Sequence, residues 1–141
     1  MTFGEETDFM PTELFKLPFP SSGRSHEEFR ELDGRQCLLA CHYAADGSKA
    51  VNLLFDGIEA YKGTLYRACT VEMIRVANDR VVDLGPTPWL EEVSTQLSKH
   101  GEDNSGLRHL RIYFDDGPCY EFICRSFQAG QLGESVPGRK E

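Results

Sequence analysis

The stretch GLRHLRIYFDDGPCYEFICRSF, residues 106–127, decides the fold that the sequence predicts. Polar and apolar residues alternate on both sides of Asp-Gly-Pro, which is the pattern of two β-strands joined by a turn. Asp and Gly favour turns, and Pro118 has no N–H group to donate to a neighbouring strand. The stretch therefore predicts a β-hairpin whose three-residue loop runs from Asp116 to Pro118, with Gly117 at positive φ.

The apolar residues select the register of this hairpin, because a slip of one residue exchanges the two faces of a strand. Pairing Phe114 with Tyr120 gathers the apolar side chains on one face: Leu110, Ile112, Phe114, Tyr120, Phe122 and Cys124. The opposite face, called the polar face below, carries His109, Arg111, Tyr113, Asp115, Cys119, Glu121, Ile123 and Arg125. In this register Tyr113 lies opposite Glu121, and His109 lies opposite Arg125.

Four residues of the polar face form the candidate site. Core packing does not explain a surface that combines aromatic, cationic and acidic side chains, and Tyr and Arg are frequent at binding hot spots. We therefore expect a protein partner to contact His109, Arg111, Tyr113 and Glu121. In the alternative interpretation this face is structural, either exposed to solvent or covered by the N-terminal arm.

The sequence favours a non-enzymatic role, although it does not decide the matter. A Cys–His nucleophilic pair needs direct contact, yet His109 lies roughly 20 Å along the strand from Asp115, the residue expected opposite Cys119. Cys37 and Cys41 share one strand face but are ~13 Å apart, which is too far for a single zinc ion. Phosphate-binding loops and nucleophile-elbow motifs are absent from the sequence. We expect no catalytic residue, no metal and no cofactor.

The N-terminal part of the chain predicts an arm and a short helix. Residues 1–24 contain prolines among scattered phenylalanines, which indicates an extended arm. Ser25 and Glu28 have the spacing of a capping box, which predicts a helix from His26 to Leu32. We expect three aromatic side chains to hold the arm against the core: Phe9, Phe15 and Phe19.

Residues 36–56 predict a second β-hairpin, because their apolar residues also alternate with polar ones around a turn. In the predicted register Tyr43 pairs with Val51 across a three-residue loop. Gly57 indicates a bend, after which a strand pattern resumes over residues 58–70.

The clearest helix is TPWLEEVSTQLSKHG, residues 87–101. Thr87 is a suitable N-cap, and Pro88 fits the first helical position. Residues 80–85 predict a strand before this helix, whereas residues 71–78 suit either a short helix or a strand.

Together these elements predict an α+β fold, a single domain over residues 25–127 that is dominated by antiparallel β-sheet and carries one or two short helices. The sheet would be sandwich-like or a partly open barrel. Residues 1–24 would form the arm, and residues 128–141, which are rich in Gly and polar side chains, would form a flexible C-terminal tail.

The composition is typical of a soluble protein with one domain of ordinary size, since 40% of the 141 residues are hydrophobic. The net charge of -8 disfavours nucleic acid and anionic membranes as partners and would favour a basic protein. The acidic N-terminal residues and the lack of a long apolar run lead us to expect neither a signal peptide nor a transmembrane helix. The five cysteines are irregularly spaced, so we expect free thiols, a cytoplasmic location and core positions for Cys37, Cys41 and Cys124.

Three segments carry a resemblance to known proteins: VNLLFDGIEAYKGT at 51–64, RVVDLGPTPWLEEV at 80–93 and LRHLRIYFDDGPCYEF at 107–122. Together they resemble small bacterial β-rich proteins, some of which are similar to immunity proteins of polymorphic toxin systems. The resemblance implies an α+β or sandwich-like fold and a non-enzymatic role in binding a protein. It carries no functional residue over to this chain.

We therefore expect a cytoplasmic, non-enzymatic protein-binding module, such as a toxin-neutralising immunity protein. The alternative is a small enzyme or ligand-binding protein with a pocket between sheet and helix. A deep pocket lined by His109, Arg111 and Tyr113 would favour the alternative. A flat or convex acidic surface would favour the protein-binding module.

Overall fold

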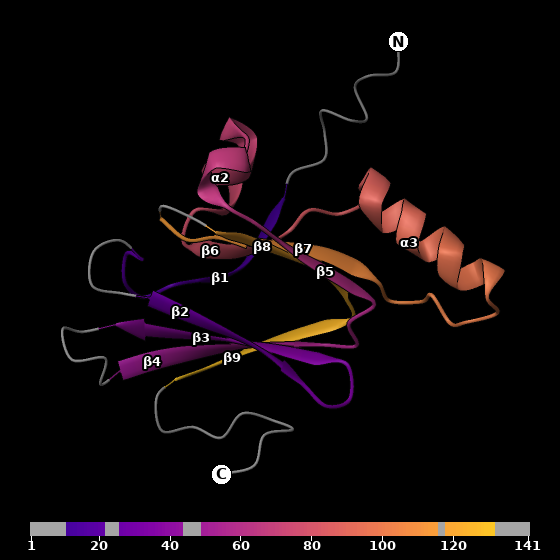
Figure 1. Ribbon diagram of the computed structural model, residues 1–141, viewed down its shortest axis with the longest axis horizontal. Helices are drawn as coiled ribbons and strands as arrows, with labels where there is room; N and C mark the ends of the chain where they lie inside the picture. The colour runs from indigo at the N-terminus through magenta and orange to yellow at the C-terminus, as the bar shows by residue number, and fades with distance from the viewer. Residues whose placement is uncertain (1–10, 22–25, 44–48, 116–117, 132–141) are drawn as a thin grey trace.

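Two antiparallel β-sheets face each other in the computed structural model, which describes residues 11–21, 26–43, 49–115 and 118–131 (Figure 1). The five-stranded sheet contains, in spatial order, β1 (Thr12–Lys16), β6 (Arg80–Asp83), β7 (Arg108–Tyr113), β8 (Cys119–Cys124) and β5 (Ala60–Thr64). The four-stranded sheet contains β2 (His26–Leu32), β3 (Gln36–Tyr43), β4 (Lys49–Asp56) and β9 (Ser126–Gln131). This arrangement confirms the predicted sheet-dominated α+β class.

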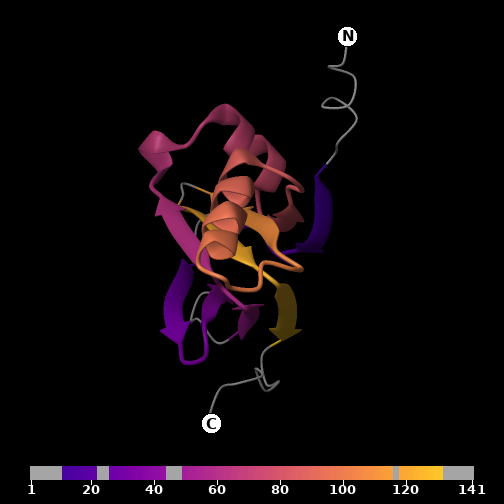
Figure 2. The same ribbon diagram turned by 90° about the vertical axis from the view of Figure 1, so that its right-hand side faces the viewer.

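The helices lie on the outer side of the five-stranded sheet, away from the second sheet (Figures 1 and 2). They are the 3₁₀ helix η1 (Tyr66–Ala68), α2 (Val71–Ala77) and α3 (Pro88–Lys99). Thr87 caps α3 by accepting a hydrogen bond from the N–H of Leu90, and Pro88 starts the helix, as the sequence predicts. The ambiguous residues 71–78 form a helix, and the strand pattern of residues 58–70 ends earlier, at Thr64.

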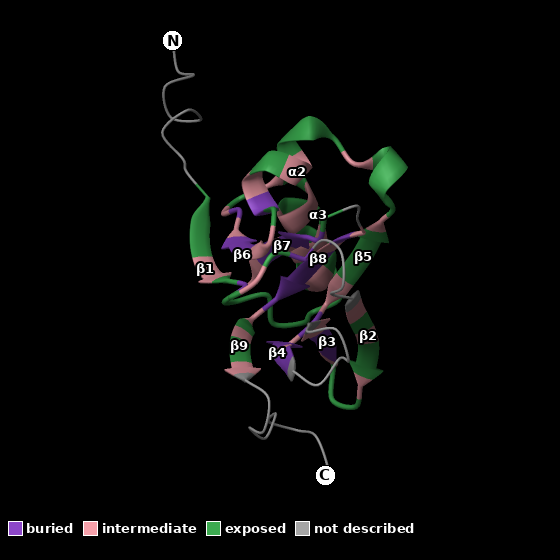
Figure 3. Ribbon diagram, turned by 90° about the vertical axis from the view of Figure 1, so that its left-hand side faces the viewer, coloured by how far each residue is buried: buried purple, intermediate pink, exposed green. Residues whose placement is uncertain are grey.

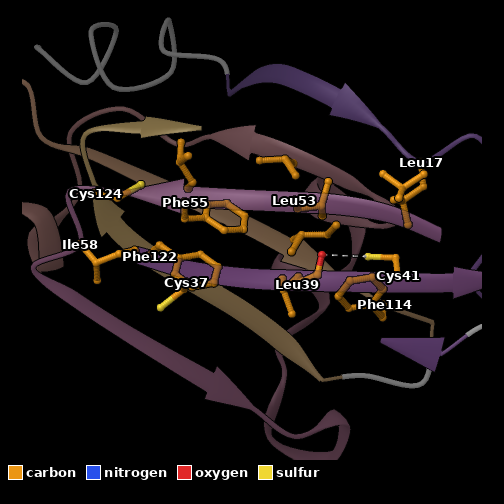
Figure 4. Close-up of a cluster of buried hydrophobic side chains, with 14 residues drawn as sticks. Leu17, Cys37, Leu39, Cys41, Leu53, Phe55, Ile58, Phe114, Phe122 and Cys124 are labelled. Atoms are coloured by element: carbon orange, nitrogen blue, oxygen red, sulfur yellow. Dashed lines mark hydrogen bonds between the residues drawn. The ribbon is translucent and has the colours of Figure 1, made fainter. Parts of the chain in front are cut away.

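The main core lies between the two sheets, and its side chains come from the apolar rows of both hairpins (Figure 4). Phe55 of β4 stacks on Phe122 of β8 with ring centroids 3.9 Å apart and ring planes 16° apart. Buried residues gather in the strands, whereas the helices are mostly exposed or half-buried (Figure 3). The three cysteines expected in the core, Cys37, Cys41 and Cys124, are all buried there.

Both hairpins have the predicted faces but a register that differs from the predicted one by two residues. Tyr120 pairs with Ile112 instead of Phe114, and Val51 pairs with Cys41 instead of Tyr43. A shift of two residues leaves every side chain on its face, so the apolar pattern cannot distinguish the two registers. The connections are correspondingly longer, and their centres, including Gly117, lie outside the described residues.

The predicted helix over residues 26–32 is wrong, because this segment forms the edge strand β2. All seven of its residues pair with β3, which satisfies its backbone groups more completely than an isolated helix of two turns could. The Phe29 side chain then packs against the core, where its ring stacks on that of Tyr120 with the ring centroids 5.6 Å apart. Tertiary pairing therefore overrides the local capping signal.

The two chain ends take part in the sheets more than the sequence predicts. β1 lies within the predicted arm and pairs with β6, and Phe15 and Phe19 pack against the core as expected, whereas Phe9 lies outside the described residues. The predicted tail begins too early, since residues 128–131 belong to β9 and pair with β4. Phe127 explains this difference. Its ring centroid lies 5.2 Å from that of Phe55, and this contact helps to hold β9 beside β4.

Gly57 forms the predicted bend after β4, and its substitution gives a first testable prediction. Its φ is 69°, and an added Cβ would lie 3.0 Å from the Cβ of Arg125. Arg125 cannot move away freely, because its guanidinium donates to the carbonyl oxygen of Gly57 and to Glu59. We expect Gly57→Ala to lower the free energy of unfolding by about 1–2 kcal/mol from backbone strain alone, with the contact adding to the loss.

Gly34 supplies the matched control for this measurement. Its φ of 76° is similar, but an added Cβ would meet nothing within 4 Å. Gly34→Ala therefore reports the strain without the contact. Urea unfolding of the two variants should show the larger loss for Gly57→Ala, and equal losses would show that Arg125 makes room.

Candidate functional site

The polar face of the β7–β8 hairpin lies beneath the helices. Tyr113 is only 2% exposed and packs with Ala77 of α2 and with Cys119. His109 and Glu121 are 4% and 2% exposed. This part of the polar face is therefore neither a solvated sheet surface nor one covered only by the N-terminal arm.

Three charged residues form a row across three neighbouring strands. Glu121 of β8 pairs with Arg111 of β7 on one side and with Lys62 of β5 on the other. Directly opposed residues of adjacent strands have Cβ atoms about 5 Å apart, so the carboxylate lies between two cations. The Arg111 Nε donates to Glu121 Oε1 at 3.3 Å. The row therefore alternates in charge across the outer face of the sheet.

His109 joins this row to helix α3. Its Nε2 lies 2.7 Å from Glu121 Oε1, and its Nδ1 lies 2.7 Å from the hydroxyl of Thr87. The same hydroxyl accepts the N–H of Leu90 as the N-cap of α3. The Thr87 hydroxyl and both ring nitrogens of His109 are satisfied when Thr87 donates its hydroxyl proton to His109 Nδ1 and the His109 Nε2–H donates to the Glu121 carboxylate. The start of α3 is thus tied to the sheet through hydrogen bonds.

The carboxylate of Glu121 is held in its ionised form. Burial opposes ionisation, but the hydrogen bond from His109 and the positive charges of Arg111 and Lys62 outweigh it. The pKa of Glu121 consequently lies below the ordinary value for glutamate. A carboxylate that favours its ionised form therefore lies beneath the helices and pairs with Arg111.

Arg111 has unused hydrogen-bonding capacity. Its side chain is 11% exposed, and its Nη1 is buried with no hydrogen-bond partner among the described residues. A buried donor without a partner is unfavourable by about 1–3 kcal/mol, and most such groups in proteins meet water or a ligand. The Nη1 atom therefore marks a place where an acceptor would be stabilised.

A pocket of about 670 Å³, with Arg111 among its lining residues, lies between the sheet and the helices. Its size falls within the range of small-molecule binding sites. Its polar lining residues are Lys62, Thr64, Glu72, Thr87, His109, Arg111 and Glu121. Its apolar lining residues are Pro11, Ala68, Met73, Leu84, Pro88 and Trp89.

Trp89, at the start of α3, contacts two of the basic residues of the pocket, Lys62 and His109. The Lys62 ammonium lies 4.4 Å from the centroid of the indole ring, and the imidazole of His109 meets the ring edge-on at 5.1 Å. Cation–π contact of this kind stabilises a Lys side chain in one position. Trp89 therefore places the Lys62 ammonium at the pocket.

The pocket gathers three of the four residues expected at the site, His109, Arg111 and Glu121, and leaves Tyr113 in the packing beneath α2. The sequence did not indicate Lys62, because its pairing with Glu121 joins strands far apart in the chain. Thr87 was recognised only as a helix cap. Thr87 stands close in sequence to Trp89, the single tryptophan of the chain, and this proximity could have indicated that Thr87 belongs to the site.

The cysteines of the described residues are free thiols. Burial raises the pKa of Cys37 to about 11 and that of Cys119 to about 12, so both thiols stay protonated at neutral pH. The five cysteines are free, and the part of the chain that the structure describes contains no cluster of side chains suited to a metal ion.

No family model matches the chain, and no curated protein or solved structure is significantly similar to it. The resemblance to immunity proteins therefore stays a prediction. None of the described helices is long and apolar enough to span a membrane.

Proposed function

We propose that this protein binds a small anionic ligand in the pocket between the five-stranded sheet and the two helices. The observation that carries the proposal is the Arg111 side chain in the pocket lining, whose Nη1 has no hydrogen-bond partner among the described residues. Guanidinium groups bind carboxylates and phosphates well, because their N–H donors match the geometry of two oxygens. Lys62 supplies a second cation in the same lining.

The site is built for ligand binding more than for contact with a flat protein surface. Its central residues, His109 and Glu121, are buried, and a partner would reach them only through the pocket. Their hydrogen bonds hold Arg111 and the start of α3 in fixed positions before any ligand arrives. A preorganised site loses little conformational entropy on binding.

The expected protein-binding function stays a prediction. One observation favours it as a second candidate: Leu65, Tyr66 and Val71 are 73%, 53% and 73% exposed, on and beside η1. Exposed apolar side chains close together are found at protein interfaces. A cytoplasmic location also stays a prediction, in keeping with the free cysteines.

Trp89 provides a direct test, because it is the single tryptophan of the chain and lines the pocket. We expect at least one of acetate, phosphate and phenylacetate to change its fluorescence saturably, and calorimetry to confirm the binding. Lys62→Gln should weaken that binding by about tenfold, because it removes a charged donor.

Lys99→Gln is the matched control, since Lys99 is also exposed but lies at the far end of α3 from Thr87. It should bind as the unaltered protein does. The proposal fails if no anion in the panel binds saturably, or if the two lysine variants lose affinity equally.

A further inference from the structure

We infer that the ligand of this pocket is a monocarboxylate with an apolar body. This inference rests on the proposed function and goes beyond it by naming the chemical class of the ligand. The pocket lining restricts that class in three ways: through its charge, through its size and through its apolar wall.

The charges of the lining favour one negative charge on the ligand over two. Arg111 and Lys62 are balanced by Glu121 and by Glu72, which is exposed on the same lining. A monoanion leaves one negative charge in excess, whereas a phosphate dianion leaves two, beside the buried carboxylate of Glu121. A carboxylate has two oxygens, and the lining contains two cationic side chains that can donate to them, Arg111 and Lys62.

The volume and the apolar lining require a ligand larger than an inorganic ion. The pocket measures about 670 Å³, most of which a bound phosphate or acetate would leave to water. Nearly half of its lining residues are apolar, including Trp89, Met73 and Leu84. An apolar substituent that displaced water from these side chains would add affinity in proportion to the area it covers.

The cation and the apolar wall meet at one place. The Lys62 ammonium lies over the indole ring of Trp89, 4.4 Å from its centroid. A carboxylate bound to Lys62 would therefore carry its substituent close to the indole. Met73 comes from α2 and Trp89 from α3, so the substituent would contact both helices that cover the sheet.

Ligand ranking by calorimetry and Trp89 fluorescence tests the inference, with acetate, inorganic phosphate, phenylacetate and benzylamine as probes. We expect phenylacetate to bind at least about tenfold more tightly than acetate or phosphate, because only phenylacetate combines the charge with an apolar body. Benzylamine, with the opposite charge, should bind more weakly than phenylacetate.

The Met73→Ala variant tests the contribution of the apolar body to affinity separately from that of the carboxylate. It should weaken phenylacetate binding by about fivefold, since it removes apolar surface, and leave acetate binding unchanged. Circular dichroism and urea unfolding check that the fold is retained, because Met73 also accepts the N–H of Thr70 at the start of α2 and packs against the cluster that contains Tyr113.

The outcomes distinguish this inference from the proposed function. If phosphate binds as tightly as phenylacetate, the inference of a monocarboxylate ligand is wrong, whereas the proposed anion-binding function is still supported. Tighter binding of benzylamine than of phenylacetate would overturn both, as would the absence of saturable binding by every probe.

Discussion

The Glu121→Ala variant is expected to lose about 3–5 kcal/mol of unfolding free energy. The Glu121 side chain is 3% exposed, and it accepts hydrogen bonds from both His109 and Arg111. Its removal leaves the charge of Arg111 buried without a counterion and takes away the acceptor at His109 Nε2, which helps to orient the imidazole toward Thr87. Urea unfolding followed by circular dichroism measures the loss.

Two further variants show whether burial is the cause. Glu121→Gln keeps the shape and a hydrogen-bond acceptor, so it should lose less than Glu121→Ala. Glu28→Ala removes a carboxylate whose pair with Arg30 is largely exposed, and it should leave the stability nearly unchanged. Similar losses for Glu121→Ala and Glu28→Ala would contradict the buried network.

The same carboxylate has a defined effect on acid stability. The pKa of Glu121 is lower in the folded protein than the ordinary glutamate value that applies to the unfolded chain. Its contribution is therefore complete above the ordinary glutamate pKa and is lost as the pH falls through the lower, folded pKa. Glu121→Gln should show a shallower loss of stability over this acidic range than the unaltered protein.

Phe122→Ala is expected to destabilise the protein by about 3–5 kcal/mol. Phe122 is fully buried between the sheets and stacks on Phe55 at 3.9 Å (Figure 4). Truncation removes apolar contacts from both sheets and leaves a cavity that β-sheet neighbours cannot easily fill. The loss should appear as a lower urea midpoint with little change in the slope of the transition.

The position and size of this effect can be checked with two other substitutions. Phe122→Leu retains part of the apolar volume and should lose less. Val71→Ala changes a side chain that is 73% exposed, so it should alter stability by no more than about 0.5 kcal/mol. A small loss for Phe122→Ala would mean that the two sheets are not held together at this point.

The sequence alone was sufficient for the class of the fold and for the faces of its hairpins. Alternation along residues 107–127 places Phe122 in the core and Glu121 on the opposite face, because side chains of a strand alternate strictly. The helix that starts at Pro88 was also predictable from the sequence, since the residues that cap and start it are neighbours in the chain.

Elements whose stability comes from distant partners were not readable in this way. The segment from His26 to Leu32 carries a local helix signal, yet it forms a strand because all seven of its residues pair with β3. β9 likewise becomes a strand through its pairing with β4. In both cases a non-local backbone ladder outweighs local preference.

The candidate site depends partly on local sequence and partly on tertiary structure. The sequence determined that His109, Arg111 and Glu121 share one face of a hairpin, because that depends only on odd and even positions along two strands. Only the folded chain decided that Arg111, instead of Tyr113, stands opposite Glu121, since a register shift of two residues leaves the faces unchanged. It also brought Lys62 and Thr87 to them, because pairing with β5 and the docking of α3 depend on long-range contacts that no local pattern encodes.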